Sequence, residues 1–247
     1  MGGAETLALT HTIKEMKIEI WSDIACPWCY VGKRRFERAL GSFAHRNEVE
    51  VIWRSFELDT TAPRQHAEPQ AELLARKYRV PLEEANAMNA NMTAEARKEG
   101  LDFHFDRVRV TNTFNAHRLI HFAATAGKRD TMVERLFQAY LTEGAALGDI
   151  DVLVRLAGEA GLDTGASRAT LESMAFADDV RADERRAQSF GITGVPFFAI
   201  DERYGVSGAQ QPEVLLNVIR QAWSETASAA PVASASADGC EDGSCAV

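Results

Sequence analysis

Cys26 and Cys29 are separated by Pro27 and Trp28, and they follow a run, residues 17–23, in which polar and apolar side chains alternate. That alternation predicts a half-buried strand, and the residues after the second cysteine favour a helix. Because proline is favoured at the first position of a helix, we expect Cys26 to be the N-cap. There the unpaired backbone N–H groups and the helix dipole favour the thiolate, which is the nucleophile of disulfide exchange. A second thiol one helical turn later can close onto the first, so the motif predicts thiol–disulfide oxidoreductase chemistry.

The four cysteines of the chain form two close pairs, Cys26 with Cys29 and Cys240 with Cys245. Four thiolates can hold a zinc ion, so zinc binding is an alternative interpretation of the pattern. Zinc-binding cysteine pairs usually lie in tight loops, however, and Pro-Trp at the start of an amphipathic helix is a poor zinc turn. We therefore expect no metal at the first pair. A purely structural disulfide is less favoured still, because the chain contains no cysteine outside the two pairs.

Composition and charge exclude several classes of partner. The chain has 247 residues, of which 46% are hydrophobic, so it can bury a substantial core. Its net charge of −9 gives no electrostatic support for binding a nucleic acid. The apolar stretches are too short to span a membrane, and residues 1–15 lack the features of an export signal. We therefore expect a cytoplasmic protein, and there cysteine pairs are more often catalytic, redox-sensing or metal-binding than structural.

Hydrophobic periodicity and helix breakers predict the order of elements along the chain. We expect strands at 17–23, 50–56, 196–200 and 203–207, helices at 27–46, 70–78, 82–99 and 212–223, and further helices between 114 and 189. This order predicts an α/β fold, a two-layer domain that is interrupted by a helical insertion.

The expected domain boundaries follow from these elements. Residues 16–62 form the first part of the sheet domain, residues 63–187 the helical insertion, and residues 188–225 the second part of the sheet domain. Residues 226–247 are rich in alanine and serine and predict a flexible tail that carries the second cysteine pair.

Two motifs, together with the interrupted order of elements, resemble the DsbA family of thioredoxin-fold proteins. The motifs are Cys26-Pro27-Trp28-Cys29 after a strand and Gly194-Val195-Pro196-Phe197-Phe198 at the start of a late strand. The string of residues 22–30, with Asn112-Thr113 and Ala116-His117, is similar to the FrnE-type branch of that family. The resemblance covers residues 16–225. It implies a thioredoxin fold, with a central mixed sheet flanked by helices, and oxidoreductase or isomerase activity on protein disulfides without an organic cofactor.

The resemblance also implies roles for individual residues. It implies a cis peptide bond between Val195 and Pro196 that packs beside Cys26 and leaves the Val195 backbone free to pair with a substrate strand. The alternative is a proline at the first position of a strand, which is also tolerated. Trp28 is expected to offer an apolar surface to the substrate.

Asn112 and His117 have two interpretations that the sequence leaves open. The resemblance implies that both line a wall facing Cys26, where either side chain can polarise a thiol or orient a substrate. Alternatively, Thr111 or Asn112 caps a helix and His117 is a half-buried residue with satisfied hydrogen bonds.

Trp28 stands where the periplasmic oxidants of the family carry histidine, so the cation that would stabilise the Cys26 thiolate is missing. A less stabilised thiolate makes a less oxidising couple. We therefore expect a moderate or reducing pair that suits reduction or reshuffling. Its expected partners are disulfide-containing or misfolded proteins and a cellular thiol reductant, either thioredoxin or a low-molecular-weight thiol.

The tail pair, Cys240 and Cys245, flanks Glu241 and Asp242, which disfavour thiolates by charge repulsion. The tail should therefore be the more reducing couple and should pass electrons to Cys26 and Cys29. A linker of about 14 residues has a root-mean-square reach of roughly 20 Å, which suits an intramolecular redox partner. The alternative is a tail whose cysteines are incidental.

Three other functions compete with disulfide exchange. The first is glutathione-dependent isomerisation of small molecules by a kindred split-thioredoxin fold, although such proteins typically carry serine in place of the first cysteine. The second is a holdase chaperone that binds exposed apolar segments, and the third is zinc storage by all four thiolates.

Overall fold

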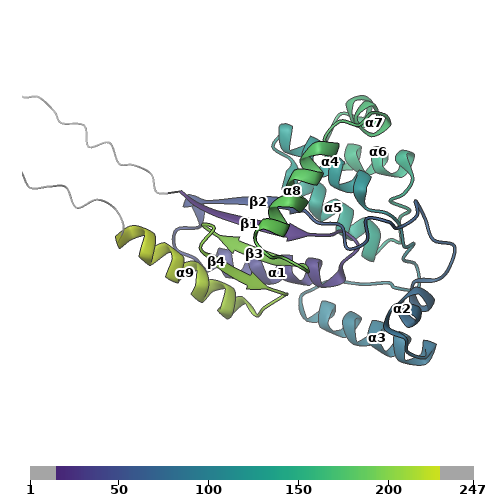
Figure 1. The fold of residues 1–247 in the computed structure, drawn as a ribbon, viewed down its shortest axis with the longest axis horizontal. Helices are drawn as coiled ribbons and strands as arrows, with labels where there is room; N and C mark the ends of the chain where they lie inside the picture. The colour runs from purple at the N-terminus through teal and green to yellow at the C-terminus, as the bar shows by residue number, and fades with distance from the viewer. Residues whose placement is uncertain (1–14, 229–247) are drawn as a thin grey trace, which may run out of the picture.

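The computed structural model describes residues 15–228, in which four strands form one mixed sheet in the order β2-β1-β3-β4 (Figure 1). The first strand, β1 (Met16–Ser22), pairs parallel with β2 (Val49–Ser55) and antiparallel with β3 (Phe197–Ile200). The edge strand β4 (Tyr204–Ser207) pairs antiparallel with β3. The chain therefore builds one sheet from its two distant ends, which confirms the predicted α/β fold with a mixed sheet.

In the described part of the chain, the helices surround this sheet: one connects β1 to β2, seven fill the long segment between β2 and β3, and one follows β4. They are α1 (Pro27–Gly41), α2 (Gln70–Tyr78), α3 (Leu82–Lys98), α4 (Phe114–Thr125), α5 (Arg129–Leu141), α6 (Ile150–Glu159), α7 (Thr164–Glu172), α8 (Ala177–Ser189) and α9 (Pro212–Ser228), with a 3-10 turn at Arg46–Glu48. Figure 1 shows α4 to α7 gathered beyond one end of the strands, with α2 and α3 as a separate hairpin. No helix within residues 15–228 is long and apolar enough to cross a membrane.

The first helix is shorter than its sequence pattern predicts. It ends at Gly41, and the backbone N–H of Ser42 donates to the carbonyl oxygens of Arg38 and Ala39. The predicted last helix, in contrast, begins at Pro212 as expected but continues beyond Trp223.

Strand β1 is buried on both faces, so the prediction of a half-buried strand was wrong. One core cluster joins Ile18 and Ile20 to residues of α1 and α9, and a second joins Trp21 to residues of α8. Glu19 points to the same face as Trp21 and is only 4% exposed. The alternation of polar and apolar residues suggested a solvated face, but α8 covers that face, and Arg186 of α8 and Arg54 of β2 supply the charges that pair with Glu19.

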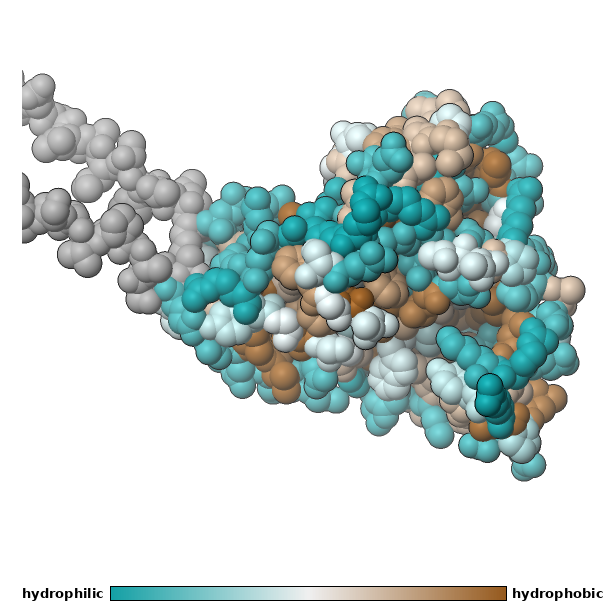
Figure 2. All heavy atoms as spheres, viewed as in Figure 1, coloured by the Kyte–Doolittle hydropathy of each residue, from teal (hydrophilic) through white to brown (hydrophobic). Residues whose placement is uncertain are grey.

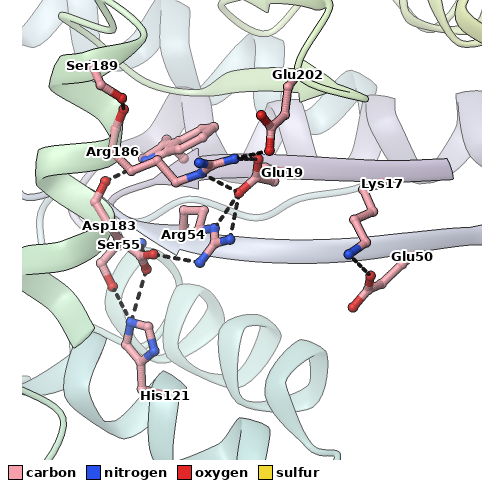
Figure 3. A network of polar contacts seen from close by, with 11 residues as sticks. Lys17, Glu19, Glu50, Arg54, Ser55, His121, Asp183, Arg186, Ser189 and Glu202 are labelled. Carbon is pink, nitrogen blue, oxygen red and sulfur yellow. Dashed lines mark hydrogen bonds and ion pairs between the residues drawn. The ribbon is translucent and has the colours of Figure 1, made fainter.

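A polar network connects the sheet to α4 and α8 (Figure 3). The carboxylate of Asp183 accepts hydrogen bonds from the backbone N–H of Ser55 (2.9 Å) and from the Arg54 guanidinium (2.9 Å). His121 lies 3.1 Å from the same carboxylate. Glu19 accepts bonds from both Arg54 and Arg186, so the two buried carboxylates share one arginine.

The same network fixes α8 across the sheet. The indole N–H of Trp21 donates to the backbone oxygen of Asp183 (3.0 Å), and Arg186 bridges Glu19 to Glu202 in the turn between β3 and β4. Burial opposes the charged form of Asp183, but His121, the Ser55 backbone and Arg54 outweigh it and lower the pKa of Asp183. These contacts dock the inserted helices on the sheet at a defined position.

Replacing Asp183 by Ala should destabilise the protein by about 3 kcal/mol, because it leaves the buried Ser55 N–H without its acceptor and removes one of the two carboxylates that pair with the partly buried Arg54. The measurement is urea unfolding at neutral pH. The control is Arg185→Ala, an exposed position on the same helix, which should change stability by less than about 0.5 kcal/mol. Equal effects of the two substitutions would contradict the role given to the network.

Candidate active site

Cys26 is the N-cap of α1, as the sequence predicts, with extended backbone angles (φ −93°, ψ 110°) and Pro27 in the first turn. Its backbone N–H donates to the carbonyl oxygen of Asp23 (3.0 Å), and its own carbonyl oxygen accepts from the N–H of Cys29 (3.0 Å). The first turn of the helix contains no acidic side chain. The Cys26 sulfur therefore sits at the positive end of the helix dipole without a competing negative charge in that turn.

The two thiols of the motif are both free, but their surroundings differ. Cys26 is 6% exposed and Cys29 is 1% exposed, so Cys26 is the outer thiol. Burial raises the pKa of the Cys29 thiol well above its ordinary value, and the adjacent Cys26 raises it further. Cys29 thus keeps its proton at neutral pH unless another group removes it.

The loop that enters β3 lies directly beside Cys26. The Cys26 thiol donates to the carbonyl oxygen of Val195 at 3.6 Å, and the Val195–Pro196 peptide bond is cis, as the resemblance implies. The Pro196 ring also packs on α1. A Cβ atom added at Gly32 would lie 2.9 Å from the Pro196 Cγ atom, so glycine permits this close approach. The sequence analysis missed Gly32, since a single glycine inside a helix does not reveal its neighbour.

The aromatic residues of the two motifs differ in burial. Trp28 is 44% exposed at the start of α1, and Leu58 beyond β2 is 43% exposed. Phe198 is fully buried and stacks on Phe36 in the core, whereas Phe197 is half-buried and packs against Trp21. Trp28 is therefore the residue of these motifs that presents the larger apolar surface. Figure 2 shows further hydrophobic residues between the sheet and the α2–α3 hairpin on the face in view.

Asp23, which the sequence analysis did not single out, lies under the cysteine loop and is only 2% exposed. Its carboxylate accepts hydrogen bonds from the backbone N–H groups of Leu58 (2.7 Å) and Ala25 (3.2 Å). The His117 Nε2 atom lies 3.5 Å from the Asp23 Oδ1 atom. Burial opposes the charged carboxylate, but His117 and the two N–H groups outweigh it, so the pKa of Asp23 is lowered.

His117 itself is 2% exposed, so it is fully buried rather than half-buried. It belongs to α4 and faces the Asp23 carboxylate from the insertion. Burial opposes its charged form, but Asp23 first, and then Glu57 and Glu184, outweigh burial and raise the pKa of His117. The structure thus places His117 behind the cysteine loop, next to a carboxylate.

Asn112 lies at the start of α4, where its side-chain oxygen accepts the backbone N–H of Phe114 (2.9 Å). Its amide donates to the Glu57 carboxylate (3.3 Å). The N-cap of α4 is Thr113, so Asn112 lies one residue before the cap and links the insertion to the segment after β2. No contact between Asn112 and either thiol is present among the described residues.

The described residues contain no group of histidine, cysteine and acidic side chains that could hold a metal ion. Cys240 and Cys245 lie outside residues 15–228, so neither their proposed redox role nor the four-thiolate zinc alternative can be placed in the structure.

Comparisons with known proteins agree with this geometry. The family model for DSBA-like thioredoxin domains matches residues 17–220. The uncharacterized protein YwbO of Bacillus subtilis (strain 168) is 31% identical over 204 residues, which cover 82% of this chain and 94% of that protein. The crystal structure of a probable DsbA oxidoreductase from Streptomyces coelicolor is 44% identical, with a TM-score of 0.84 over 94% of this chain and 99% of that one.

A more distant structure, the cytosolic disulfide reductase DsbM from Pseudomonas aeruginosa, is 16% identical and shares the fold. It matches with a TM-score of 0.60 over 85% of this chain and 99% of that chain.

An alkylating reagent should modify Cys26 before Cys29 in the reduced protein. Cys26 is the more exposed thiol, and the raised pKa of Cys29 leaves little of its thiolate at mildly acidic pH. We expect at least about a tenfold difference in rate, since one pKa unit corresponds to a tenfold change in thiolate. Peptide mass spectrometry after brief labelling measures both rates, and faster labelling of Cys29 would reverse the assignment of nucleophile and resolving thiol.

Proposed function

Since this chain belongs to the family of DSBA-like thioredoxin domains and is a thioredoxin-fold oxidoreductase, we propose that it exchanges disulfides of protein substrates through Cys26 and Cys29. One observation carries the proposal: two free thiols lie at the start of the same helix, Cys26 at the N-cap beside Val195 and 6% exposed, Cys29 one turn deeper and 1% exposed. That asymmetry suits a nucleophile and a resolving thiol.

The proposed reaction has two steps. The Cys26 thiolate attacks a substrate disulfide, a mixed disulfide forms between Cys26 and the substrate, and the first substrate sulfur leaves as a thiolate. The Cys29 thiolate then attacks the Cys26 sulfur, and the second substrate thiolate leaves. The substrate gains two electrons and the enzyme holds a Cys26–Cys29 disulfide, which a thiol reductant must reduce again.

We propose that Val195 and Trp28 receive the substrate. The Val195 backbone lies next to the nucleophile, so an extended substrate segment that pairs there has its disulfide within reach of Cys26. The exposed side chain of Trp28, two residues after Cys26, offers an apolar contact. His117 is buried behind the loop, and the half-buried Asn112 is engaged by Phe114 and Glu57, so neither forms part of this proposed surface.

We propose reduction or reshuffling as the direction of the reaction, because the dipeptide between the cysteines contains tryptophan and no cation. A couple of that kind suits a reducing compartment, so the cytoplasm is the proposed location. The proposed substrates are disulfide-containing or misfolded proteins, and the proposed reductant is thioredoxin or a low-molecular-weight thiol. Membership of the FrnE-type branch belongs to the same proposal.

Dithiothreitol reduces insulin slowly, and the protein should accelerate that reaction. Replacing Cys26 by Ser should abolish the acceleration, because the attacking thiol is missing. Replacing Cys29 by Ser should preserve the first attack and accumulate a mixed disulfide with the substrate, which non-reducing electrophoresis and mass spectrometry detect.

A holdase would retain its activity in both variants. A glutathione-dependent isomerase would need no resolving thiol and would be indifferent to the second substitution. Either result would contradict the proposed reaction.

We further propose that the tail pair reduces the core pair within one chain. Under mild oxidation, the Cys29→Ser variant should then form a disulfide between Cys26 and either Cys240 or Cys245, found by peptide mapping of the monomer. The control is the same variant with both tail cysteines replaced by serine, which should form no such bond. Absence of the adduct in the first variant would make the tail cysteines incidental.

A further inference from the structure

A buried arginine on α1 joins the helical insertion to the turn between β4 and α9. Arg35 is only 5% exposed. Its Nε–H donates to the carboxylate of Glu99 at the end of α3 (2.7 Å), and its Nη1–H donates to the backbone oxygen of Ala209 (2.6 Å). A second carboxylate of α3, that of Glu95, lies 3.5 Å from the Nη2 atom. A buried guanidinium needs an acceptor for each of its donor groups, and here two segments far apart in the sequence supply them.

The turn that Arg35 binds also holds the loop beside the nucleophile. The backbone N–H of Gly208 donates to the carbonyl oxygen of Pro196 (2.8 Å), which continues the antiparallel pairing of β3 with β4 by one residue. Gly208 has a φ of +79°, a conformation that glycine adopts without strain. Ala209 follows directly in the chain, so the acceptor of Arg35 is adjacent to the residue that holds Pro196.

A second contact of α1 reaches the same place. Gly32 lies one turn before Arg35, and residues three apart lie on the same face of a helix. A Cβ atom added at Gly32 would lie 2.9 Å from the Pro196 Cγ atom and 3.5 Å from the Ala209 Cβ atom. The helix therefore meets the loop and the turn together, with Gly32 allowing the close approach and Arg35 supplying the hydrogen bond. Val195, which precedes Pro196, accepts from the Cys26 thiol at 3.6 Å.

We propose that Arg35 is a positioning residue, which holds the turn after β4 and thereby keeps the Val195–Pro196 loop in the shape that pairs with an extended polypeptide. This inference rests on the proposed function, in which the Val195 backbone receives the substrate. Arg35 takes part in no bond-making step. It determines which disulfides are good substrates: a disulfide in an extended protein segment needs the loop, and a small disulfide without a peptide backbone does not.

Arginine suits this position better than another cation. Its planar guanidinium binds Glu99 and Ala209 at the same time in a fixed geometry, whereas the ammonium group of lysine is a point charge on a flexible stem. Arg38, one turn further along α1, binds the other oxygen of Glu99 (3.0 Å), but its side chain is 56% exposed. Among the interactions of residues 15–228, none joins Arg38 to the turn after β4. Arg38 thus shares the carboxylate of Arg35 without its link to the loop.

The test compares a protein disulfide with a small one, in the full-length chain with serine at both tail cysteines. Reduction of insulin by dithiothreitol, measured over a range of insulin concentrations, gives KM and kcat for the protein substrate. The small substrate is dithiobis(nitrobenzoate). Its coloured thiolate reports attack by Cys26 when Cys29→Ser is added to the same chain.

Replacing Arg35 by Met, which donates no hydrogen bond, should raise the KM for insulin about tenfold, the effect expected when a hydrogen bond to a charged group is lost. The kcat for insulin and the rate with dithiobis(nitrobenzoate) should each change by less than about twofold, because only substrate binding is impaired. Hydrogen exchange should become faster in the peptide that contains Gly208. Replacing Arg35 by Lys keeps a positive charge beside Glu99, so it also serves if the first variant does not fold, and it should raise the KM in the same direction by a smaller factor.

Arg38→Met is the matched control, since it removes an arginine from the same helix and the same carboxylate. It should leave the KM for insulin and the rate with dithiobis(nitrobenzoate) unchanged. An unchanged KM in both Arg35 variants would overturn the inference. Equal losses with insulin and with the small disulfide would also overturn it, because that is the result of a purely structural role. If the parent chain did not accelerate insulin reduction at all, the proposed function would fail and this inference with it.

Discussion

The buried carboxylate of Asp23 connects the three segments on which the candidate site depends. It binds the backbone of Ala25 in the cysteine loop, the backbone of Leu58 after β2, and the imidazole of His117 on α4. A charged group in the interior is tolerated only with such partners, because an unpaired buried charge costs several kcal/mol. The loop that presents Cys26 is therefore fixed to the sheet and to the insertion by a single side chain.

Helix α4 repeats this arrangement one turn later. His117 faces Asp23 under the cysteine loop, and His121 faces Asp183 on α8. Buried polar pairs of this kind often contribute little net stability compared with apolar packing, but removing one partner is costly. Their effect here is positional: they join the insertion to the end of β1, to β2 and to the segment after β2.

Local sequence signals predicted the elements that need no distant partner. Pro27 and Pro212 marked helix starts, and the alternating or β-branched runs marked the strands. What the sequence could not reveal depends on contacts across the chain. The burial of Glu19 follows from α8, more than 150 residues away, and the importance of Asp23 follows from Leu58 and His117. An acidic residue at a strand end has many possible partners, and only the fold selects among them.

The central claim is that Cys26 and Cys29 form a redox couple in which a buried thiol resolves an outer one. The most direct measurement uses a variant in which both tail cysteines are replaced by serine. The variant is equilibrated in glutathione buffers of known potential, and its free thiols are then quantified by mass spectrometry. The account predicts one two-electron transition, in which the ratio of oxidised to reduced protein changes tenfold per about 30 mV, with a midpoint more reducing than the value of about −120 mV known for DsbA. A chain that only accumulates a glutathione adduct, or a midpoint at or above that potential, would contradict it.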